Sequence, residues 1–147
     1  MNITTIQYRY TQNINSFKGG CRANMNSRKE KNIGLFAVNG AKILAKKAQF
    51  EVPENGKFSK VGIIFNIPNT QNLAHYNIEY DELEPTNTRR FSIGATRKGS
   101  DRLTSIYLAK GSKQDIINFL SDEENCSKIQ ETLRQVSQET DDYFSSF

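Results

Sequence analysis

The sequence is poor in the residues from which most active sites are built. Its 147 residues include no tryptophan, three prolines, two cysteines and one histidine. A site with two or more histidines is therefore excluded, and any Ser-His-Asp or Cys-His-Asn triad would have to use His75. We expect no metal, no cofactor and no catalytic residue, and we interpret the chain as a binding protein more readily than as an enzyme.

The sequence also lacks the spaced cysteine motifs of metal sites and has no long apolar run. Cys21 and Cys126 belong to no CxxC motif and no Cys/His spacing, so neither a zinc site nor a disulfide scaffold is predicted. We expect two free thiols in a reducing cytoplasm. No apolar run approaches the roughly 18 residues that a membrane helix needs, and the first residues lack the regions of a signal peptide. We expect a cytoplasmic protein with no membrane partner.

The composition is that of a globular protein. Apolar residues make up 36% and charged residues 24% of the chain, whereas disordered chains combine low hydrophobicity with high net charge. A chain of this length is the usual size of one domain, and its folding buries roughly 68–70% of the surface that the unfolded chain exposes. We expect residues 1–147 to form a single domain.

Charge is distributed unevenly along the chain, whose net charge is +4. Residues 1–60 carry eleven Lys and Arg against three Asp and Glu, residues 61–110 carry six against five, and residues 111–147 carry three against eight. We favour the interpretation that the basic front and the acidic tail attract each other within the fold. The alternative is that the basic front binds an anionic partner.

The first third of the chain predicts strands and a long loop. Residues 6–10 alternate apolar and polar side chains, which is typical of a half-buried strand. Residues 11–32 have no period, and we expect a loop that lies over the sheet. Residues 33–52 predict a hairpin, because their central Asn-Gly pair is the strongest signal of a tight β-turn. The alternative for residues 41–48 is a helix, since AKILAKKA consists of good helix formers.

The middle of the chain predicts further strands. Residues 60–67 predict a central strand that ends before Pro68. Residues 74–80 alternate cleanly, with His75 on the polar face. Residues 89–111 predict a hairpin. Its first strand turns one face inward, at Phe91, Ile93 and Ala95.

The last third changes to a helical period. Ser112 with Asp115, and Ser121 with Glu124, fit the S-x-x-[DE] capping box that begins a helix. One stripe of an amphipathic helix of about 20 residues follows. It consists of Cys126, Ile129, Leu133, Val136, Thr140 and Tyr143. The predicted fold class is therefore α+β: an antiparallel sheet of about six or seven strands, with a short helix and a long C-terminal helix packed on one face.

Three features could carry chemistry, and each also has a purely structural interpretation. Cys21 lies between Lys18 and Arg22, whose charges would favour its thiolate, but the loop has no phosphate-binding fingerprint. His75 fits an ordinary surface histidine. An acidic run could hold Mg²⁺, or it could be a solvated strand end. This run consists of Glu79, Asp81, Glu82 and Glu84.

Basic side chains are the candidate partner-binding residues. The candidates are Arg89, Arg90, Arg97, Lys98, Arg102, Lys18, Arg22, Arg28 and Lys29. Those of the hairpin form two clusters about 23 Å apart, at roughly 3.3 Å per residue of strand, and the turn cluster is expected to project from a mobile tip. Because Phe91 faces inward, we expect no exposed aromatic side chain among them for stacking on bases. The alternative is an ordinary solvated hairpin.

These features favour a small non-enzymatic cytoplasmic binding protein. Such a protein would act as an inhibitor, as an immunity-type protein or as a regulatory factor. A protein partner needs only a complementary surface of about 800 Å² on each side, which leaves no sequence motif. The first alternative is a nucleic-acid-binding protein that uses the basic N-terminal part and the 89–102 hairpin. The second is a nuclease-type toxin or a thiol enzyme. The high content of Asn, Lys and Ile is typical of an AT-rich bacterial or phage genome and fits all three.

Overall fold

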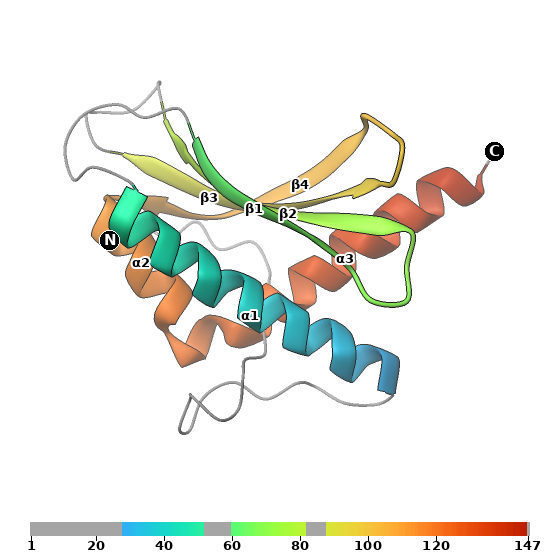
Figure 1. Ribbon diagram of the computed structural model, residues 1–147, viewed down its shortest axis with the longest axis horizontal. Helices are drawn as coiled ribbons and strands as arrows, with labels where there is room; N and C mark the ends of the chain where they lie inside the picture. Colours follow the sequence, from blue (N-terminus) through green and yellow to red (C-terminus); the bar gives the residue numbers. More distant parts are fainter. Residues whose placement is uncertain (1–27, 52–59, 82–87, 147) are drawn as a thin grey trace.

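The computed structural model describes residues 28–51, 60–81 and 88–146. Its elements follow in the order α1 (Arg28–Glu51), β1 (Lys60–Asn66), β2 (Asn72–Tyr80), β3 (Arg89–Arg97), β4 (Leu103–Gly111), α2 (Lys113–Ser121), the 3₁₀ turn η2 (Glu123–Asn125) and α3 (Cys126–Ser145). The three helices lie together on one side of a curved sheet (Figure 1). The predicted α+β class with an antiparallel sheet is confirmed.

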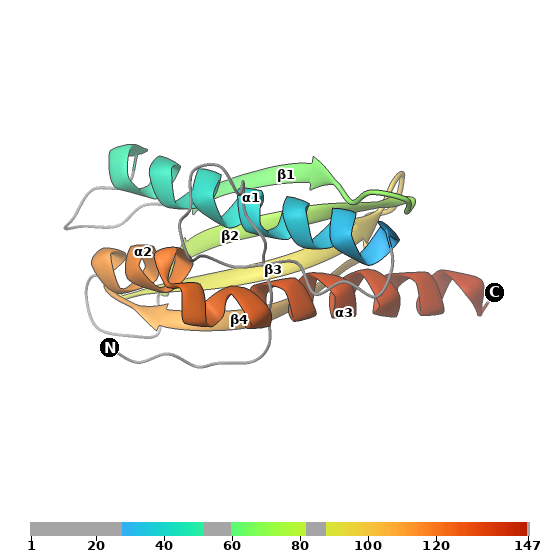
Figure 2. The ribbon, with the colours of Figure 1, turned by 90° about the horizontal axis from the view of Figure 1, so that it is seen from below.

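The sheet has four strands, in the order β1-β2-β3-β4. Each strand pairs antiparallel with the next one along the chain, and Figure 2 shows them side by side in this order. The expectation of six or seven strands is wrong in number, because α1 occupies the residues of the predicted 33–52 hairpin. The strand predicted at residues 6–10 lies outside the described residues. Among the described strands, β1 lies at an edge of the sheet, whereas its sequence predicts a central strand.

Helix α1 forms where the Asn-Gly pair predicts a turn. Its buried side chains recur at helical spacing, at Ile33, Ala37, Val38, Ala41, Leu44 and Ala48. Gly40 serves close packing here, because a Cβ at this position would lie 2.7 Å from the ring of Phe65 and 2.9 Å from that of Tyr76. The helix alternative for residues 41–48 is thus the right one, since good helix formers there also present a face that the sheet buries.

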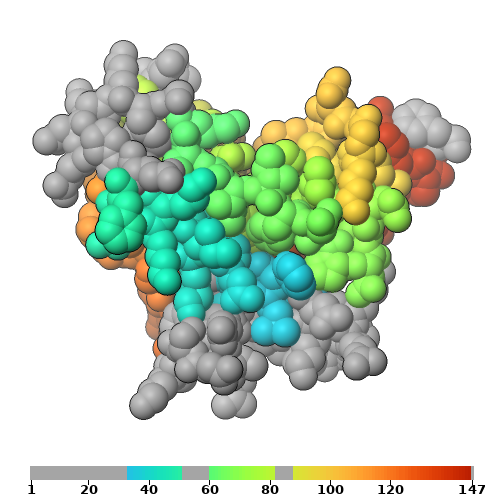
Figure 3. All heavy atoms as spheres, viewed as in Figure 1, coloured from blue at the N-terminus to red at the C-terminus, as the bar shows by residue number. Residues whose placement is uncertain are grey.

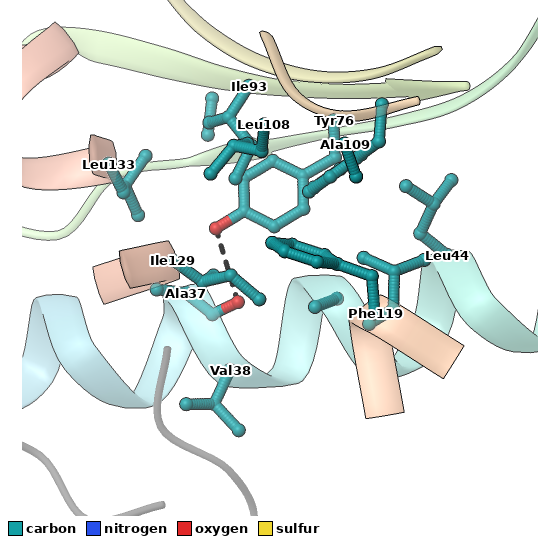
Figure 4. Close-up of a cluster of buried hydrophobic side chains, with 14 of the residues drawn as sticks. Ala37, Val38, Leu44, Tyr76, Ile93, Leu108, Ala109, Phe119, Ile129 and Leu133 are labelled. Carbon is teal, nitrogen blue, oxygen red and sulfur yellow. Dashed lines mark hydrogen bonds between the residues drawn. The ribbon is translucent and has the colours of Figure 1, made fainter. Parts of the chain in front are cut away.

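One hydrophobic core lies between the helices and the sheet. Figure 4 shows its centre, where Tyr76 of β2 points toward α1 and donates a hydrogen bond to the carbonyl oxygen of Ala37 at 3.1 Å. Burial raises the pKa of Tyr76 well above its ordinary value, so the phenol stays a donor. Phe91 packs between Tyr76 and Phe119, with ring centroids 6.0 and 6.1 Å away. The predicted inner face of the hairpin is confirmed.

The C-terminal helices form largely as predicted. Ser112 accepts a hydrogen bond from the Asp115 N–H, and the Asp115 carboxylate accepts one from the Ser112 N–H, so the first capping box is confirmed. The second is wrong, because Asp122 and not Ser121 caps the η2 turn, by accepting from the Glu124 N–H. The 20 residues of α3 bury the predicted stripe at Cys126, Ile129, Leu133, Val136 and Thr140, but not at Tyr143.

Cys126, the first residue of α3, is disulfide-bonded. In the described part of the chain no cysteine is free, so the expectation of two free thiols is wrong. Cys21, the other cysteine of the sequence, lies outside the described residues. Spacing along the chain does not reveal such a bond, because a disulfide requires Cα atoms about 4.4–6.8 Å apart in space and sets no condition on sequence.

Candidate functional site

The described helices all cover one face of the sheet and leave the other, which we call the open face (Figures 1 and 2). Each strand turns every second side chain toward it. The strand register arranges these side chains in rows across the sheet: Lys60, Glu79, Arg90 and Lys110; then Gly62, Asn77, Ser92 and Tyr107; then Ile64, His75, Gly94 and Ser105. The open face is the candidate functional site.

Two glycines lie on the open face, and neighbouring side chains pack closely over both. A Cβ at Gly62 would clash with Oδ1 of Asn77, and a Cβ at Gly94 would lie 2.7 Å from Cδ1 of Leu103. The neighbouring side chains therefore fold across both glycines. The strand ends bend away from the helices (Figure 1), and the space-filling view is hollowed above the middle of the sheet, with the β3–β4 turn rising on one side (Figure 3). A concave surface of this kind can receive a protruding segment of a partner.

A charged cluster with an aromatic ring occupies one end of the open face. The guanidinium carbon of Arg90 lies 4.4 Å from the ring centroid of Tyr107, within cation–π range. The carboxylate of Asp81, which is almost fully buried, lies 3.4 Å from Nε of Arg90 and 4.0 Å from Nζ of Lys110. These contacts fix the position of Arg90 over Tyr107 and leave the tyrosine exposed.

His75 lies near the middle of the open face, on the polar side of β2 as predicted. Its Nε2 is 2.9 Å from Oγ1 of Thr96 on β3. Burial lowers the pKa of His75, and the positive charge of Lys60 lowers it further. A nucleophilic site needs a hydroxyl as nucleophile, a histidine as base and a third group that orients the base. The first two are present here. Among the described residues, no carboxylate bonds the other ring nitrogen of His75.

The arginines of the β3–β4 turn are docked on α3. Arg97 donates from Nε to Oδ1 of Asn72 at 3.0 Å and from Nη2 to Oδ1 of Asp141 at 2.8 Å. The guanidinium carbon of Arg102 lies 3.6 Å from the ring centroid of Tyr143. The expectation that Arg97 and Arg102 project from the tip is therefore wrong, because these side chains join the hairpin to the C-terminal end of α3.

The arginine pair at the other end of β3 divides between the two faces of the sheet. Arg89 is fully buried on the side of the helices, and burial lowers its pKa, with the nearby Tyr80 acting in the opposite direction. Arg90 stands on the open face. Arg89 is thus withdrawn from any contact surface, and Arg90 is the member of the pair that a partner can reach.

The remaining basic candidates contribute little to the described surface. Lys98 is exposed at the β3–β4 turn. Arg28 and Lys29 belong to the first turn of α1, whereas Lys18 and Arg22 lie outside the described residues. Among the candidates whose side chains the structure describes, Arg89 is buried, Arg90 lies on the open face, and Arg97 and Arg102 contact α3, so these four do not form one surface.

Reasoning from the sequence missed the side chains that shape the open face. Tyr107 is exposed next to Arg90, so the expectation of no exposed aromatic among the basic residues is wrong. Asn77 and Ser92 share its row across three strands. Alternation along the return strand of the predicted hairpin could have placed Tyr107 on the face of Arg90. Only the register between strands places Asn77 and Ser92 in the same row as Tyr107.

The helical side of the molecule offers a weaker site. A hollow of about 220 Å³ lies between α1 and α2, with Lys42, Lys46 and Ile117 in its lining. Burial lowers the pKa of Lys42, and the charge of Lys46 lowers it further. Ligand pockets usually measure roughly 300–1,000 Å³, so this hollow is small for one. Within the described residues, no three His, Cys, Asp or Glu side chains are grouped to hold a metal ion.

Comparison with models of known protein families, with curated proteins and with solved structures finds no match for this chain. Its function is therefore inferred from the geometry and chemistry of the open face.

Proposed function

We propose that this chain is a non-enzymatic binding protein that receives a protein partner on its open face and acts as an inhibitor or regulatory factor by occupying that partner's surface. The Arg90–Tyr107 pair on the concave open face is the observation that carries this proposal (Figure 3). Arg and Tyr are among the residues that dominate the energy of protein interfaces. Their contact, together with Asp81, orders both side chains before binding, which reduces the entropy lost when a partner docks.

The charge balance of the open face supports a protein partner. Its cations, Lys60, Arg90 and Lys110, are offset by the carboxylates of Glu79 and Asp81. Binding to nucleic acid draws instead on many cations that neutralise phosphates. The rest of the face mixes apolar side chains with hydroxyl, amide and imidazole groups, which is typical of a protein interface.

A single-stranded nucleic acid is the second candidate partner. The exposed ring of Tyr107 next to Arg90 favours it, because aromatic side chains on antiparallel sheets stack on unpaired bases. The basic N-terminal part lies outside the described residues, and Arg97 and Arg102 of the hairpin are engaged by α3. A nuclease-type enzyme has less support, because among the described residues the only hydrogen-bonding side chain shown for His75 is that of Thr96. Cys21, the candidate nucleophile of a thiol enzyme, lies outside the described residues.

The cytoplasmic location and the bacterial or phage origin stay proposals. No helix in the described part of the chain is both long enough and apolar enough to cross a bilayer. The disulfide bond of Cys126 removes the argument from free thiols, because disulfides persist mainly in oxidising compartments.

The proposal is tested by replacing the Arg90–Tyr107 pair. We expect Arg90→Ala and Tyr107→Ala to keep the fold and to weaken binding to a captured partner by at least about tenfold, or about 1.4 kcal/mol. Arg134→Ala is the matched control, since Arg134 lies on the far side of the molecule on α3 and pairs with Glu131. Quantitative affinity capture, followed by titration with the purified partner, measures the effect.

Two results would count against a protein partner. If the parent and both open-face variants bind the partner equally tightly, the open face is not the surface that binds it. Tight binding of a poly(dT) or poly(U) oligonucleotide, lost in Tyr107→Ala and falling steeply with salt, would replace the protein partner by a single-stranded nucleic acid.

A further inference from the structure

Strand β1 forms an edge of the sheet that carries few of the usual protections. No other described strand lies beyond it. Its sequence, KVGIIFN, contains no proline, and its inward side chains, Val61, Ile63 and Phe65, are all apolar. The register between β1 and β2 runs without a bulge, whereas the pairing at the other edge of the sheet has a shift between Phe91 and Ser92. Natural proteins commonly protect edge strands with prolines, bulges or inward charges, because an unprotected edge pairs with another strand.

The hydrogen-bond pattern shows which backbone groups of β1 point outward. The Ile67 N–H donates to the Asn72 carbonyl at 3.0 Å, and antiparallel pairs alternate between bonded and non-bonded. Val61, Ile63 and Phe65 therefore bond with β2, while Lys60, Gly62, Ile64 and Asn66 direct their N–H and C=O groups away from the sheet. Lys47 agrees with this assignment, because its ammonium group donates to the Gly62 carbonyl at 3.3 Å.

Helix α1 carries an exposed apolar stripe on the same side of the molecule. Phe36, Ile43 and Phe50 are 45%, 51% and 85% exposed, and their spacing of seven residues places them along one line of the helix. The ring of Phe36 stacks on that of Phe65 in β1, with centroids 6.3 Å apart. Figure 2 shows α1 along the β1 side, with α3 along the β4 side. The stripe and the outer edge of β1 thus form one continuous surface.

We infer that this surface binds a second copy of the chain, so that two β1 strands pair antiparallel and the two sheets join into one. The sequence of β1 is self-complementary when the pairing is centred on Ile63. Val61 then faces Phe65 of the second copy on the helical side. On the open side, Ile64, which is 62% exposed, covers Gly62 of the second copy. The two Lys60 side chains lie at opposite ends, so like charges do not meet.

The area available suits a dimer with twofold symmetry. A stable interface buries about 800 Å² on each partner, more than the backbone edge of one short strand supplies. The stripe of α1 provides additional apolar area, and a twofold axis brings the same stripe from both copies together. The ammonium group of Lys47 can remain in place, because the Gly62 carbonyl has a second lone pair for a strand partner. The open face is left uncovered and doubled in extent.

Molar mass in solution tests the dimer, measured by light scattering after size exclusion over a range of concentrations. The full chain is expected at twice its 16.7 kDa mass. Ile64→Pro is expected to give a monomer with an unchanged circular dichroism spectrum, because the Ile64 N–H points outward and an edge strand accepts proline there. Ile43→Lys tests the helix stripe without touching the sheet. Leu103→Lys on β4 is the matched control, since Leu103 is 49% exposed and Ile43 is 51% exposed.

A cysteine pair tests the register directly. Ile63 lies on the proposed twofold axis in a non-bonded pair, where Cα atoms are about 4.5 Å apart and within disulfide range. Ile63→Cys is expected to give a covalent dimer on oxidation, and Ile64→Cys, which faces Gly62 of the second copy, is not. A monomer at every concentration overturns the inference. So does a dimer that survives Ile43→Lys, or one that only Leu103→Lys dissociates.

Discussion

Arg89 and Arg90 show how much one step along a strand changes the role of a side chain. Alternation sends Arg89 into the interior on the side of the helices and Arg90 onto the open face. Arg90 then contacts Tyr107 and Asp81, which fix its position. At the scale of single residues, the candidate site therefore depends on which face a residue occupies and on the neighbours that hold it there.

His75 predicts a pH dependence of folding stability. Burial and the charge of Lys60 lower its pKa in the folded chain, so between that lowered value and the ordinary 6.5 the unfolded chain binds more protons than the folded one. The stability linked to His75 is complete above the ordinary pKa and is lost as the pH falls through the folded pKa. His75→Gln keeps a hydrogen-bonding group beside Thr96 and cannot titrate.

Thermal melts from about pH 8 to about pH 5, the range in which histidine titrates, measure the effect. The melting temperature of the parent is expected to fall more steeply toward acid than that of His75→Gln. Carboxylates and other groups titrate in both proteins and cancel in the comparison. Parallel pH curves for the two proteins would contradict a lowered pKa at this position.

At the scale of elements, the β3–β4 hairpin and α3 are joined by polar and cation–π contacts. Asp141 of α3 accepts hydrogen bonds from Arg97 and from the Asn72 amide at 2.8 and 2.9 Å. Arg102 lies over the ring of Tyr143, two residues further along the helix. These contacts secure the C-terminal part of α3, beyond the apolar stripe that anchors its first turns.

We expect Arg97→Ala to lower the free energy of unfolding by about 1–2 kcal/mol, because hydrogen bonds to charged groups contribute about 1.5–3 kcal/mol and this pair is partly exposed. Lys98→Ala is the matched control, since its side chain is exposed at the same turn and is expected to change stability by less than about 0.5 kcal/mol. Urea denaturation measures both. Equal stability of the two variants would mean that the turn does not hold α3.

At the scale of the whole molecule, the sheet separates a buried face from an open one. The helices and one side of the sheet enclose the apolar core, so the other side is left for polar and mixed contacts. The disulfide bond at Cys126 adds a covalent constraint at the start of α3, which packs on this core. The described helices thus form one layer and leave the other face of the sheet uncovered.

The disulfide bond predicts that Cys126 resists alkylation. Iodoacetamide added to the denatured, unreduced protein is expected to leave the peptide that contains Cys126 unmodified, because a disulfide sulfur is not a thiolate. Reduction before alkylation should modify it completely, which serves as the control. Mass spectrometry of the peptide distinguishes the two states. Full modification without reductant would restore the expectation of a free thiol.

The sequence by itself determined the elements whose signals are local. The structure contains the predicted strand at 74–80, the hairpin at 89–111, the capping box of Ser112 and the buried stripe of α3 as far as Thr140. Their patterns depend on the period of one element or on hydrogen bonds between near neighbours, and both can be recognised in a few consecutive residues. The same alternation of side chains along a strand predicts on which face of the sheet Arg90 and His75 lie.

Only the tertiary structure decided what depends on residues far apart in the chain. The Asn-Gly pair of α1 lies in a helix because Gly40 packs against Phe65 and Tyr76, and the burial of a whole helix face outweighs a local turn preference. Strand register placed Tyr107 beside Arg90, and the docking of α3 engaged Arg97 and Arg102. These outcomes rest on contacts between elements, whose energies come from shared burial and pairing in space, and no local pattern in the sequence encodes them.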